Sequence, residues 1–305
     1  MGNQRYLILG GSGIVGRALF HKLGPEQAVA TFCQRPIPGG SFFDLRSMRL
    51  TDPLLPKHPA LTHAFVLSGI TNIDACARNL AESTRVNVEG VQQIIDDLVS
   101  GGITPIFASS DAVFDGSRGG WTEADAPNPI LTYGRQKLQV ESYLAGKHAP
   151  YAVARLSKVV STNPDEDHLL SEWMRCLERG DVIRAAHDQV FSPIDVDDAV
   201  AGMLAMANKQ LTGLYHLAGP DRCSRLELLQ ALINAVRPWA PLDNPNVVRC
   251  SIRDFPFIEA RPLDASLSSA RLQSAAGLSI TCYDTICRRF AANRFATARG
   301  KENVS

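Results

Sequence analysis

The sequence predicts an α/β fold, a doubly wound parallel sheet joined to a smaller C-terminal lobe. Short apolar runs alternate with helical segments through the first half of the 305-residue chain, and a glycine cluster joins the first run to the first helix. After about residue 160 this alternation loosens. Strands that alternate with helices imply right-handed βαβ crossovers and a parallel sheet buried on both faces.

Each predicted strand is a short apolar run bounded by polar or turn residues. In chain order these runs are 6–9, 28–32, 63–69, 103–110, 151–157 and 213–219. The segments between them predict helices over 14–23, 79–99 and 133–144.

The second half of the chain predicts the smaller lobe. Residues 161–168 are polar and contain proline, which predicts a loop, and Gly180 closes the helix that follows. The DVDD run at 195–198 predicts a helix N-cap rather than a cation site. Residues 237–264 are rich in proline and predict irregular structure. We expect a sheet domain of residues 1–160 with 181–218, and a substrate lobe of residues 161–180 with 219–305.

Composition restricts the function classes. The 31 basic and 31 acidic residues give a formal net charge of zero, which argues against a nucleic-acid binder. No apolar run approaches the roughly 20 residues of a membrane span. The seven cysteines include no CxxC pair, and the seven histidines show no metal-ligand spacing. We therefore expect no membrane segment, no metal site and a reducing, cytoplasmic environment.

The glycine cluster lies in RYLILGGSGIVGRAL, residues 5–19. Gly10 allows a tight turn after the strand, Gly13 lets a pyrophosphate approach the backbone, and Gly16 permits close helix–sheet packing. The free N–H groups at the helix start favour an anion. The alternative is a glycine-rich turn that binds nothing. The context favours a dinucleotide-binding Rossmann domain, whose expected cofactor contacts are Gly10, Ser12, Gly13, Ile14, Val15 and Gly16.

The end of the second strand indicates which dinucleotide is bound. An acidic residue there suits the ribose hydroxyls of NAD, whereas an arginine suits the 2′-phosphate of NADP. This chain reads TFCQRP at 31–36, with no acid and with Arg35 in reach. The sequence therefore predicts NADP. An exposed loop arginine is the alternative, which leaves NAD possible.

The YGRQK run places Tyr133 and Lys137 one helical turn apart, so both side chains can point the same way. A phenol has an ordinary pKa of about 10, and a neighbouring ammonium group favours the phenolate. We therefore expect Lys137 to lower the pKa of Tyr133 toward the working range.

The strand at 103–110 ends in Ser109 and Ser110. A hydroxyl at the carboxyl end of a parallel strand lies at the crevice where ligands bind, and it can polarise a substrate carbonyl there. The alternative for either serine is a helix or turn cap.

Together, GGSGIVG, SSDAVFDG and YGRQK resemble the extended short-chain dehydrogenase/reductases. More narrowly, the chain is similar to the dTDP-4-dehydrorhamnose reductase group, whose hallmark is a Ser-Thr-Asp-Tyr-Val-Phe-Asp-Gly-like run, here SSDAVFDG at 109–116. Further stretches extend the resemblance over nearly the whole chain: TNIDACARNLAESTRVNVEG, HDQVFSPIDVDDAV, GLYHLAGPDRCSRLEL and RPLDASL.

The resemblance implies a catalytic Ser110, a general acid Tyr133 and its partner Lys137. It also implies that Asn87 and the Ser68-Gly69 run lie along the cofactor. Candidates to meet a polar substrate are Asp111, Asp188, Gln189 and Arg261. Two departures put the sugar specificity in question: Ala112 replaces a usual tyrosine, and Leu156-Ser157-Lys158 replaces a usual Arg-Thr-Ser/Trp run.

These expectations describe an NAD(P)H-dependent reductase acting on a ketone, most simply the C4 carbonyl of a nucleotide-linked deoxysugar. One alternative is a nucleotide-sugar epimerase or dehydratase on the same scaffold, with Asp111 as an acid–base group. Another is a non-catalytic NADP-binding regulatory subunit, similar to that of methionine adenosyltransferase. A homodimer is common among such proteins, but no segment of this chain predicts an interface.

Overall fold

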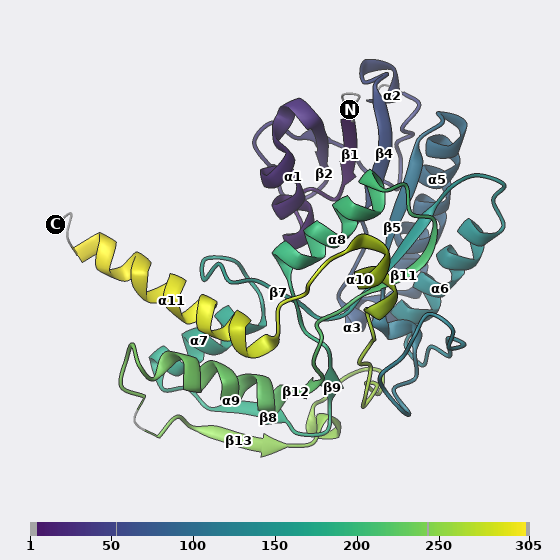
Figure 1. Ribbon diagram of the computed structural model, residues 1–305. Coiled ribbons are helices and arrows are strands. Elements are labelled where there is room, and N and C mark those ends of the chain that lie inside the picture. The colour runs from purple at the N-terminus through teal and green to yellow at the C-terminus, as the bar shows by residue number, and fades with distance from the viewer. Residues whose placement is uncertain (1–4, 53, 243, 303–305) are drawn as a thin grey trace.

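A computed structural model describes residues 5–52, 54–242 and 244–302. Its centre is a seven-stranded parallel sheet in the order β11-β6-β5-β4-β1-β2-β3, which confirms the predicted doubly wound fold (Figure 1). The strands are β1 (Arg5–Leu9), β2 (Ala28–Phe32), β3 (Ser41–Phe42), β4 (Leu61–Val66), β5 (Thr104–Ser110), β6 (Ala152–Leu156) and β11 (Gly213–Leu217).

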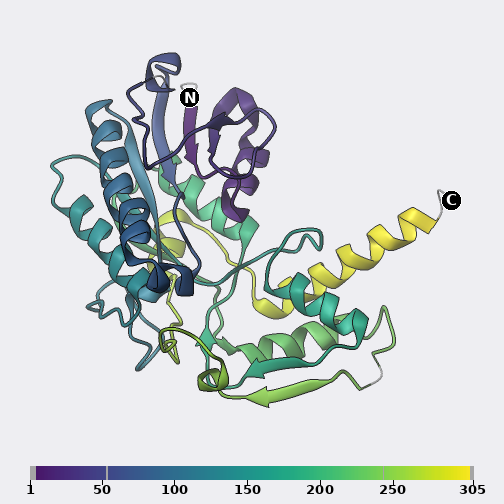
Figure 2. The same cartoon turned by 180° about the vertical axis from the view of Figure 1, so that it is seen from behind.

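Helices cover both faces of the sheet, as Figures 1 and 2 show from opposite sides. On one face, α1 (Ile14–Gln27), α8 (Val196–Asn208) and α10 (Ala270–Ala276) form one apolar core with the sheet. On the other face, α5 (Val91–Ser100) and α6 (Thr132–Ala145) pack in a second core, together with the short α2 (Leu54–Lys57). Alternate side chains of each strand enter opposite cores, because successive residues of a strand point to opposite faces.

The smaller lobe has a third apolar core of its own. It is built from α7 (Leu169–Arg179), α9 (Arg225–Val236) and α11 (Tyr283–Glu302), with β8 (Ile183–Ala186) paired in parallel with β13 (Val247–Cys250). Short strand pairs link the lobe to the sheet domain: β7 (Val159–Val160) with β10 (Ile194–Asp195), and β9 (Val190–Phe191) with β12 (Cys223–Ser224). In Figure 1 the carboxyl ends of the main strands point toward this lobe.

Two predicted helix ends agree with the structure. Gly180 caps α7 in the left-handed conformation, with φ of 72°. Asp195 is the N-cap of α8 and accepts a hydrogen bond from the Asp197 backbone N–H, so the DVDD run is a cap. In the described part of the chain, no helix has the length and apolar character needed to cross a bilayer.

The helix predicted over 79–99 is present, but it contains a π-helical turn that the sequence did not indicate. The structure has α3 (Ile73–Arg78), α4 (Leu80–Thr84), a π-helical turn (Arg85–Gly90) and then α5. Asn72 caps α3 and Asn79 caps α4 with side-chain oxygens, and from Leu80 to Ser100 the backbone stays helical across the π turn. Apolar periodicity indicates the helix but not the π turn within it.

The predicted irregularity of 237–264 is wrong at β13. That strand forms because it adds to β8 across a long sequence separation. The pairing also affects where the two domains divide. The sequence analysis assigns residues 181–218 to the sheet domain, but β8 packs in the core of the lobe. We propose that the lobe also includes β8, and that the chain returns to the sheet domain near β10.

Candidate active site

The candidate site is a cavity of about 470 Å³ at the carboxyl edge of the sheet, between β1, β4, β5 and β6 and the lobe. This is where doubly wound sheets bind ligands. The cavity brings together three groups that are distant in sequence: the glycine turn, the end of β5 and one face of α6. Its lining includes Gly10, Gly13, Gly16, Ser110, Asp111, Tyr133, Lys137, Ser157, Lys158, Gln189, Arg225 and Arg261.

The glycine turn has the shape needed for a pyrophosphate. Gly10 has φ of 92°, and a β-carbon there would lie 2.9 Å from the Ser68 backbone nitrogen. A β-carbon on Gly16 would collide with the Gly10 carbonyl oxygen, whereas one on Gly13 would meet only ordinary contact at 3.5 Å. Gly13 is exposed at the N-terminus of α1, where first-turn N–H groups lack intrahelical partners. The turn therefore fits a dinucleotide.

The predicted catalytic set meets in this cavity. Ser110 ends β5, while Tyr133 and Lys137 lie one turn apart on α6, and all three line the space beside the glycine turn. Tyr133 and Lys137 are 9% and 6% exposed, so both are shielded from bulk water. This arrangement can present a hydroxyl and a phenol to one carbonyl oxygen.

The predicted lowering of the Tyr133 pKa by Lys137 is wrong. Burial, followed by the nearby Asp111 carboxylate, raises the pKa of Tyr133 above that of a free phenol. The Lys137 ammonium lies 5.6 Å from the centroid of the Tyr133 ring and donates to the Ala108 carbonyl oxygen at 2.7 Å instead. Tyr133 is therefore a neutral phenol, which is the form that a proton donor requires.

Lys137 is itself perturbed. Burial lowers its pKa to about 8, although the carboxylate of Glu141, one turn along α6, acts in the opposite direction. Glu141 is held by a buried ion pair with Arg155, whose Nη2 lies 2.6 Å from the carboxylate. Ser109 also donates to Glu141, so this serine braces α6 while Ser110 faces the reacting centre.

Ser110 is hydrogen-bonded to the half-buried carboxyl group of the next residue, Asp111. Its hydroxyl donates to Asp111 Oδ1 at 2.9 Å and accepts from the Ala112 backbone N–H. Ser157 donates to the other Asp111 oxygen at 3.4 Å. Burial raises the pKa of Asp111 to about 6 despite these hydrogen bonds. The protonation of Asp111 therefore decides where the single Ser110 proton points.

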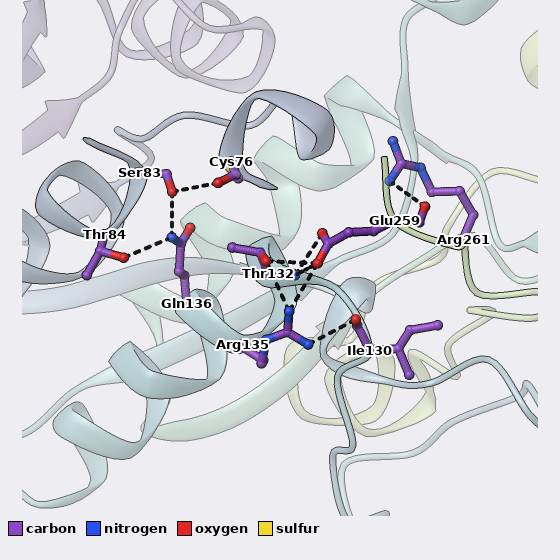
Figure 3. A network of polar contacts seen from close by, with 9 residues as sticks. All are labelled: Cys76, Ser83, Thr84, Ile130, Thr132, Arg135, Gln136, Glu259 and Arg261. Carbon is purple, nitrogen blue, oxygen red and sulfur yellow. Dashed lines mark hydrogen bonds and ion pairs between the residues drawn. The ribbon is translucent and has the colours of Figure 1, made fainter. Parts of the chain in front are cut away.

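The lobe fixes the start of the catalytic helix. Glu259 accepts from the Thr132 backbone N–H and hydroxyl and from Arg135, so a carboxylate caps α6 one residue before Tyr133 (Figure 3). On the opposite side, Gln136 donates to the Ser83 hydroxyl at 2.8 Å, as the same view shows. These contacts hold Tyr133 from both domains.

Two predicted cofactor contacts have a structural role in this arrangement. The Asn87 amide bonds both the N–H and the carbonyl of Ile70 and also donates to Gln136. A β-carbon on Gly69 would lie 2.9 Å from the Asn87 oxygen. Ser68 and Gly69 are absent from the cavity lining described above, whereas the preceding Leu67 is part of it. Asn87 thus supports the loop after β4 through the π-helical turn.

Three other predicted contacts are not among the residues that line the cavity. Arg35 is exposed just after β2, where the chain has no acidic residue. Ser12 offers its carbonyl oxygen to Arg17. Asp188 accepts from the Ser251 hydroxyl and the Ile252 N–H within the lobe, and these bonds occupy both carboxylate oxygens. Asp188 therefore organises the loop after β13 rather than lining the site.

The remaining substrate candidates, Asp111, Gln189 and Arg261, line the cavity. Two basic residues that the sequence analysis did not predict, Lys158 and Arg225, line it as well. Arg261 reaches it while paired with Asp74 at 2.7 Å, and Gln189 reaches it while accepting from Arg225. Lys158 and Arg225 come from opposite sides of the lobe junction. The departure at 156–158 was a signal for Lys158, but no motif pointed to Arg225. Among the described residues, no group of three His, Cys, Asp or Glu side chains could hold a metal.

One cavity is surrounded by a serine at a strand end, a tyrosine and a lysine one helical turn apart, and a glycine turn. This combination defines the class of extended short-chain dehydrogenase/reductases. Comparison with known families agrees with this class and narrows it. The model of the RmlD substrate binding domain matches residues 4–294, so the chain belongs to that family. This confirms the resemblance expected from the sequence.

Individual relatives are similar to the chain over most of its length. A dTDP-4-dehydrorhamnose reductase of Sinorhizobium fredii is 24% identical over 294 residues, 94% of this chain and 96% of the relative. The methionine adenosyltransferase 2 subunit beta of Rattus norvegicus is 25% identical, covering 89% and 82%. The crystal structure of dTDP-4-dehydrorhamnose reductase from Bacillus anthracis in complex with NADP has a TM-score of 0.81 at 21% identity, covering 94% and 98%.

Proposed function

We propose that the protein is an NADPH-dependent reductase that transfers hydride to a ketone, the C4 carbonyl of a nucleotide-linked deoxysugar. The single observation that carries the proposal is that Ser110, Tyr133 and Lys137 line one cavity with the glycine turn. The family supports the reaction class, and the names of the relatives support the substrate class. The absence of an acid after β2 supports NADP, and NAD remains the second candidate.

The residues of this chain have separate tasks in that reaction. Bound NADPH supplies the hydride, which forms the new C–H bond at the carbonyl carbon. Tyr133 breaks its O–H bond and gives the proton to the carbonyl oxygen, and Ser110 stabilises the charge that develops there. Lys137 stabilises the resulting phenolate until Tyr133 regains a proton from solvent. The carbonyl becomes an alcohol, and the oxidised nucleotide leaves.

Replacing Tyr133 by phenylalanine tests the proposal. We expect kcat to fall at least about 100-fold, because proton transfer by a positioned side chain contributes on that order. Affinity for NADP should change little. Tyr143→Phe is the matched control, because Tyr143 lies on the same helix and bonds Asp96. Turnover of nucleotide-linked 4-keto sugars and simple ketones is followed by NADPH absorbance, with NADH in parallel. Unchanged turnover in Tyr133→Phe would remove this residue from the mechanism.

Asp111 supports a second candidate. A carboxyl group beside Ser110 in the same cavity is what an epimerase or dehydratase with a recycled cofactor needs. Stoichiometric consumption of NADPH favours the reductase, whereas turnover without net NADPH loss favours this candidate. Co-purification with a synthetase and no carbonyl reduction would instead indicate a regulatory subunit.

The setting of the enzyme follows from the same proposal. We propose a cytoplasmic protein acting on a small molecule. All seven cysteines are free thiols, as a reducing compartment requires. A homodimer remains a proposal that sedimentation would test.

A further inference from the structure

The charge of the cavity lining differs from that of the whole chain. The protein has a formal net charge of zero, yet four basic side chains line the cavity against one acidic side chain, Asp111. The four are Lys137, Lys158, Arg225 and Arg261. A concave wall with this excess of cations favours an anionic ligand.

Two of these cations are already engaged by the protein. Lys137 donates to the Ala108 carbonyl, and Arg261 is neutralised by Asp74. Arg225 bonds only the neutral Gln189 amide through its side chain, and no ion pair within 4.0 Å joins it or Lys158 to any described residue. Lys158 also has no hydrogen bond from its ammonium group within the described part of the chain. The carboxylates of Asp111 and Glu172 act on Lys158, and that of Glu172 acts on Arg225, but none of them forms an ion pair within 4.0 Å with these two cations among the described residues, so both can still pair with a ligand.

Lys158 and Arg225 are close enough to affect one another. Lys158 is exposed, but desolvation by the surrounding protein first, and then the charge of Arg225, lowers its pKa, while the carboxylates of Asp111 and Glu172 act in the opposite direction. Burial likewise lowers the pKa of Arg225. Two cations that face one cavity repel each other, and an anion between them would remove that repulsion.

Their position places the anion near the reacting carbonyl. Lys158 follows Ser157, whose hydroxyl bonds the same Asp111 carboxylate that accepts from Ser110. Arg225 is the first residue of α9 and approaches from the lobe. Both therefore lie on the substrate side of the cavity, while the cofactor phosphates would rest on the glycine turn.

We propose that Lys158 and Arg225 form an oxyanion subsite, so that the substrate carries a phosphoryl or carboxylate group close to its ketone. This inference rests on the proposed function for the location of the ketone. The binding of the anion itself is independent of turnover. A phosphoryl group and a carboxylate present the same chemistry to this subsite. Each has oxygen atoms that accept charge-assisted hydrogen bonds from an ammonium and a guanidinium group.

Binding to the NADP-saturated protein tests the subsite by calorimetry. The probes are inorganic pyrophosphate, UDP-glucose and UDP-glucuronic acid; the last two differ in one carboxylate. Lys158→Met should weaken at least one probe about 10- to 100-fold, and Lys158→Arg should restore much of that loss. Arg225→Met should act in the same direction. Lys57→Met is the control, because this exposed lysine lies on α2, outside the cavity lining.

The pattern of losses identifies the source of the anion. Equal weakening of all three probes indicates a phosphoryl group, and weakening confined to UDP-glucuronic acid indicates a carboxylate. Unchanged affinity of Lys158→Met for every probe would overturn the subsite, as would a wild-type protein that binds NADP but no probe at millimolar concentration. A protein that binds a probe through Lys158 but reduces no ketone would keep the subsite and reject the reductase. Unchanged NADP affinity shows that each variant is folded.

Discussion

At the scale of single residues, the site contains three titratable side chains with different pKa values. Burial keeps the Tyr133 phenol neutral, lowers the pKa of Lys137 to about 8 and raises that of Asp111 to about 6. Between pH 6 and 8, the cavity therefore holds a neutral phenol, an ammonium and a carboxylate. The hydrogen bond from Ser110 to that carboxylate competes with the one that the substrate oxygen needs.

This competition predicts a pH profile. Above about pH 6, ionised Asp111 draws the Ser110 proton away from the substrate, so kcat/KM of the wild type should decline as pH rises from about 5 to 7. An amide at this position can donate to Ser110 at every pH, so Asp111→Asn should lack that decline. Both proteins should lose activity above about pH 8, where Lys137 loses its proton.

This prediction is tested by measuring kcat/KM against pH with one ketone at saturating NADPH. The proteins compared are the wild type, Asp111→Asn and Ser110→Ala. Ser110→Ala serves as the control, because it removes the hydroxyl through which Asp111 acts and should also lack the lower inflection. Persistence of that inflection in Asp111→Asn would assign it to a different group.

At the scale of elements, two glycines of the turn are needed for different reasons, which the sequence motif does not distinguish. Gly16 is required by the protein, since a β-carbon there collides with the Gly10 carbonyl. Gly13 has ordinary φ of −76° and open space, so only a ligand would exclude a side chain.

Alanine variants of the two glycines therefore give opposite results. Gly13→Ala should keep the melting temperature of the unliganded protein but weaken NADP about tenfold or more, because its methyl group occupies the approach of the pyrophosphate. Gly16→Ala should lower the melting temperature, with a loss of about 1–3 kcal/mol from overpacking. Thermal melts and NADP titrations measure both. Equal NADP affinity in Gly13→Ala and wild type would mean that the turn does not hold the phosphates.

The N-terminus of α8 shows a cap with an electrostatic cost. Asp195 is 2% exposed, and burial together with the charges of Asp197 and Asp198 raises its pKa to about 6. A folded-state pKa above the unfolded value means that the folded protein binds more protons between about pH 4 and 6. Stability from this group is therefore present below pH 4 and is lost as pH rises to about 6.

Asp195→Asn should make the protein more stable at pH 7, by about 1–2 kcal/mol, because asparagine keeps the cap without the buried charge. At pH 4 the two proteins should be nearly equal. Urea denaturation across this pH range measures the difference. Asp125→Asn is the opposite control: backbone and hydroxyl bonds from Thr122 lower the pKa of Asp125 to about 2, so its loss should destabilise the protein at pH 7. A less stable Asp195→Asn at pH 7 would contradict this reasoning.

At the scale of the whole molecule, the cavity exists because two domains are held together across it. Arg261 of the lobe pairs with Asp74 of α3 at 2.7 Å. Glu259 of the same lobe segment caps the catalytic helix, as Figure 3 shows. These contacts connect positions more than 120 residues apart. The substrate side of the site therefore depends on the domain junction, while the glycine turn belongs to the sheet domain alone.

Weakening the contacts between the two domains should change the binding of the ketone but not that of NADP. Asp74→Asn removes the charge that neutralises Arg261, and we expect KM for the ketone to rise about 3- to 10-fold while NADP affinity stays within twofold. Glu178→Gln is the control, because it breaks the exposed Arg294–Glu178 pair within the lobe and should leave both values unchanged. Steady-state kinetics with parallel NADP titration provides the measurement. A parallel loss of NADP affinity in Asp74→Asn would show that the junction also shapes the cofactor site.

The doubly wound sheet, the glycine turn and the clustering of Ser110, Tyr133 and Lys137 could all be predicted from the sequence. Each of these depends on local rules: apolar runs, backbone freedom at glycine, a one-turn spacing on a helix and the position of a residue at a strand end. The fixed handedness of βαβ crossovers then brings the strand ends to one edge.

The other features could not be predicted, because they depend on contacts between segments that are distant in the sequence. β13 forms by pairing with β8, and Asp188 is taken up by the loop after β13. The raised pKa of Tyr133 follows from burial, which spacing along a helix cannot report. Lys158 follows β6 and Arg225 begins α9 of the lobe, so no pattern along the chain could show that both line one cavity.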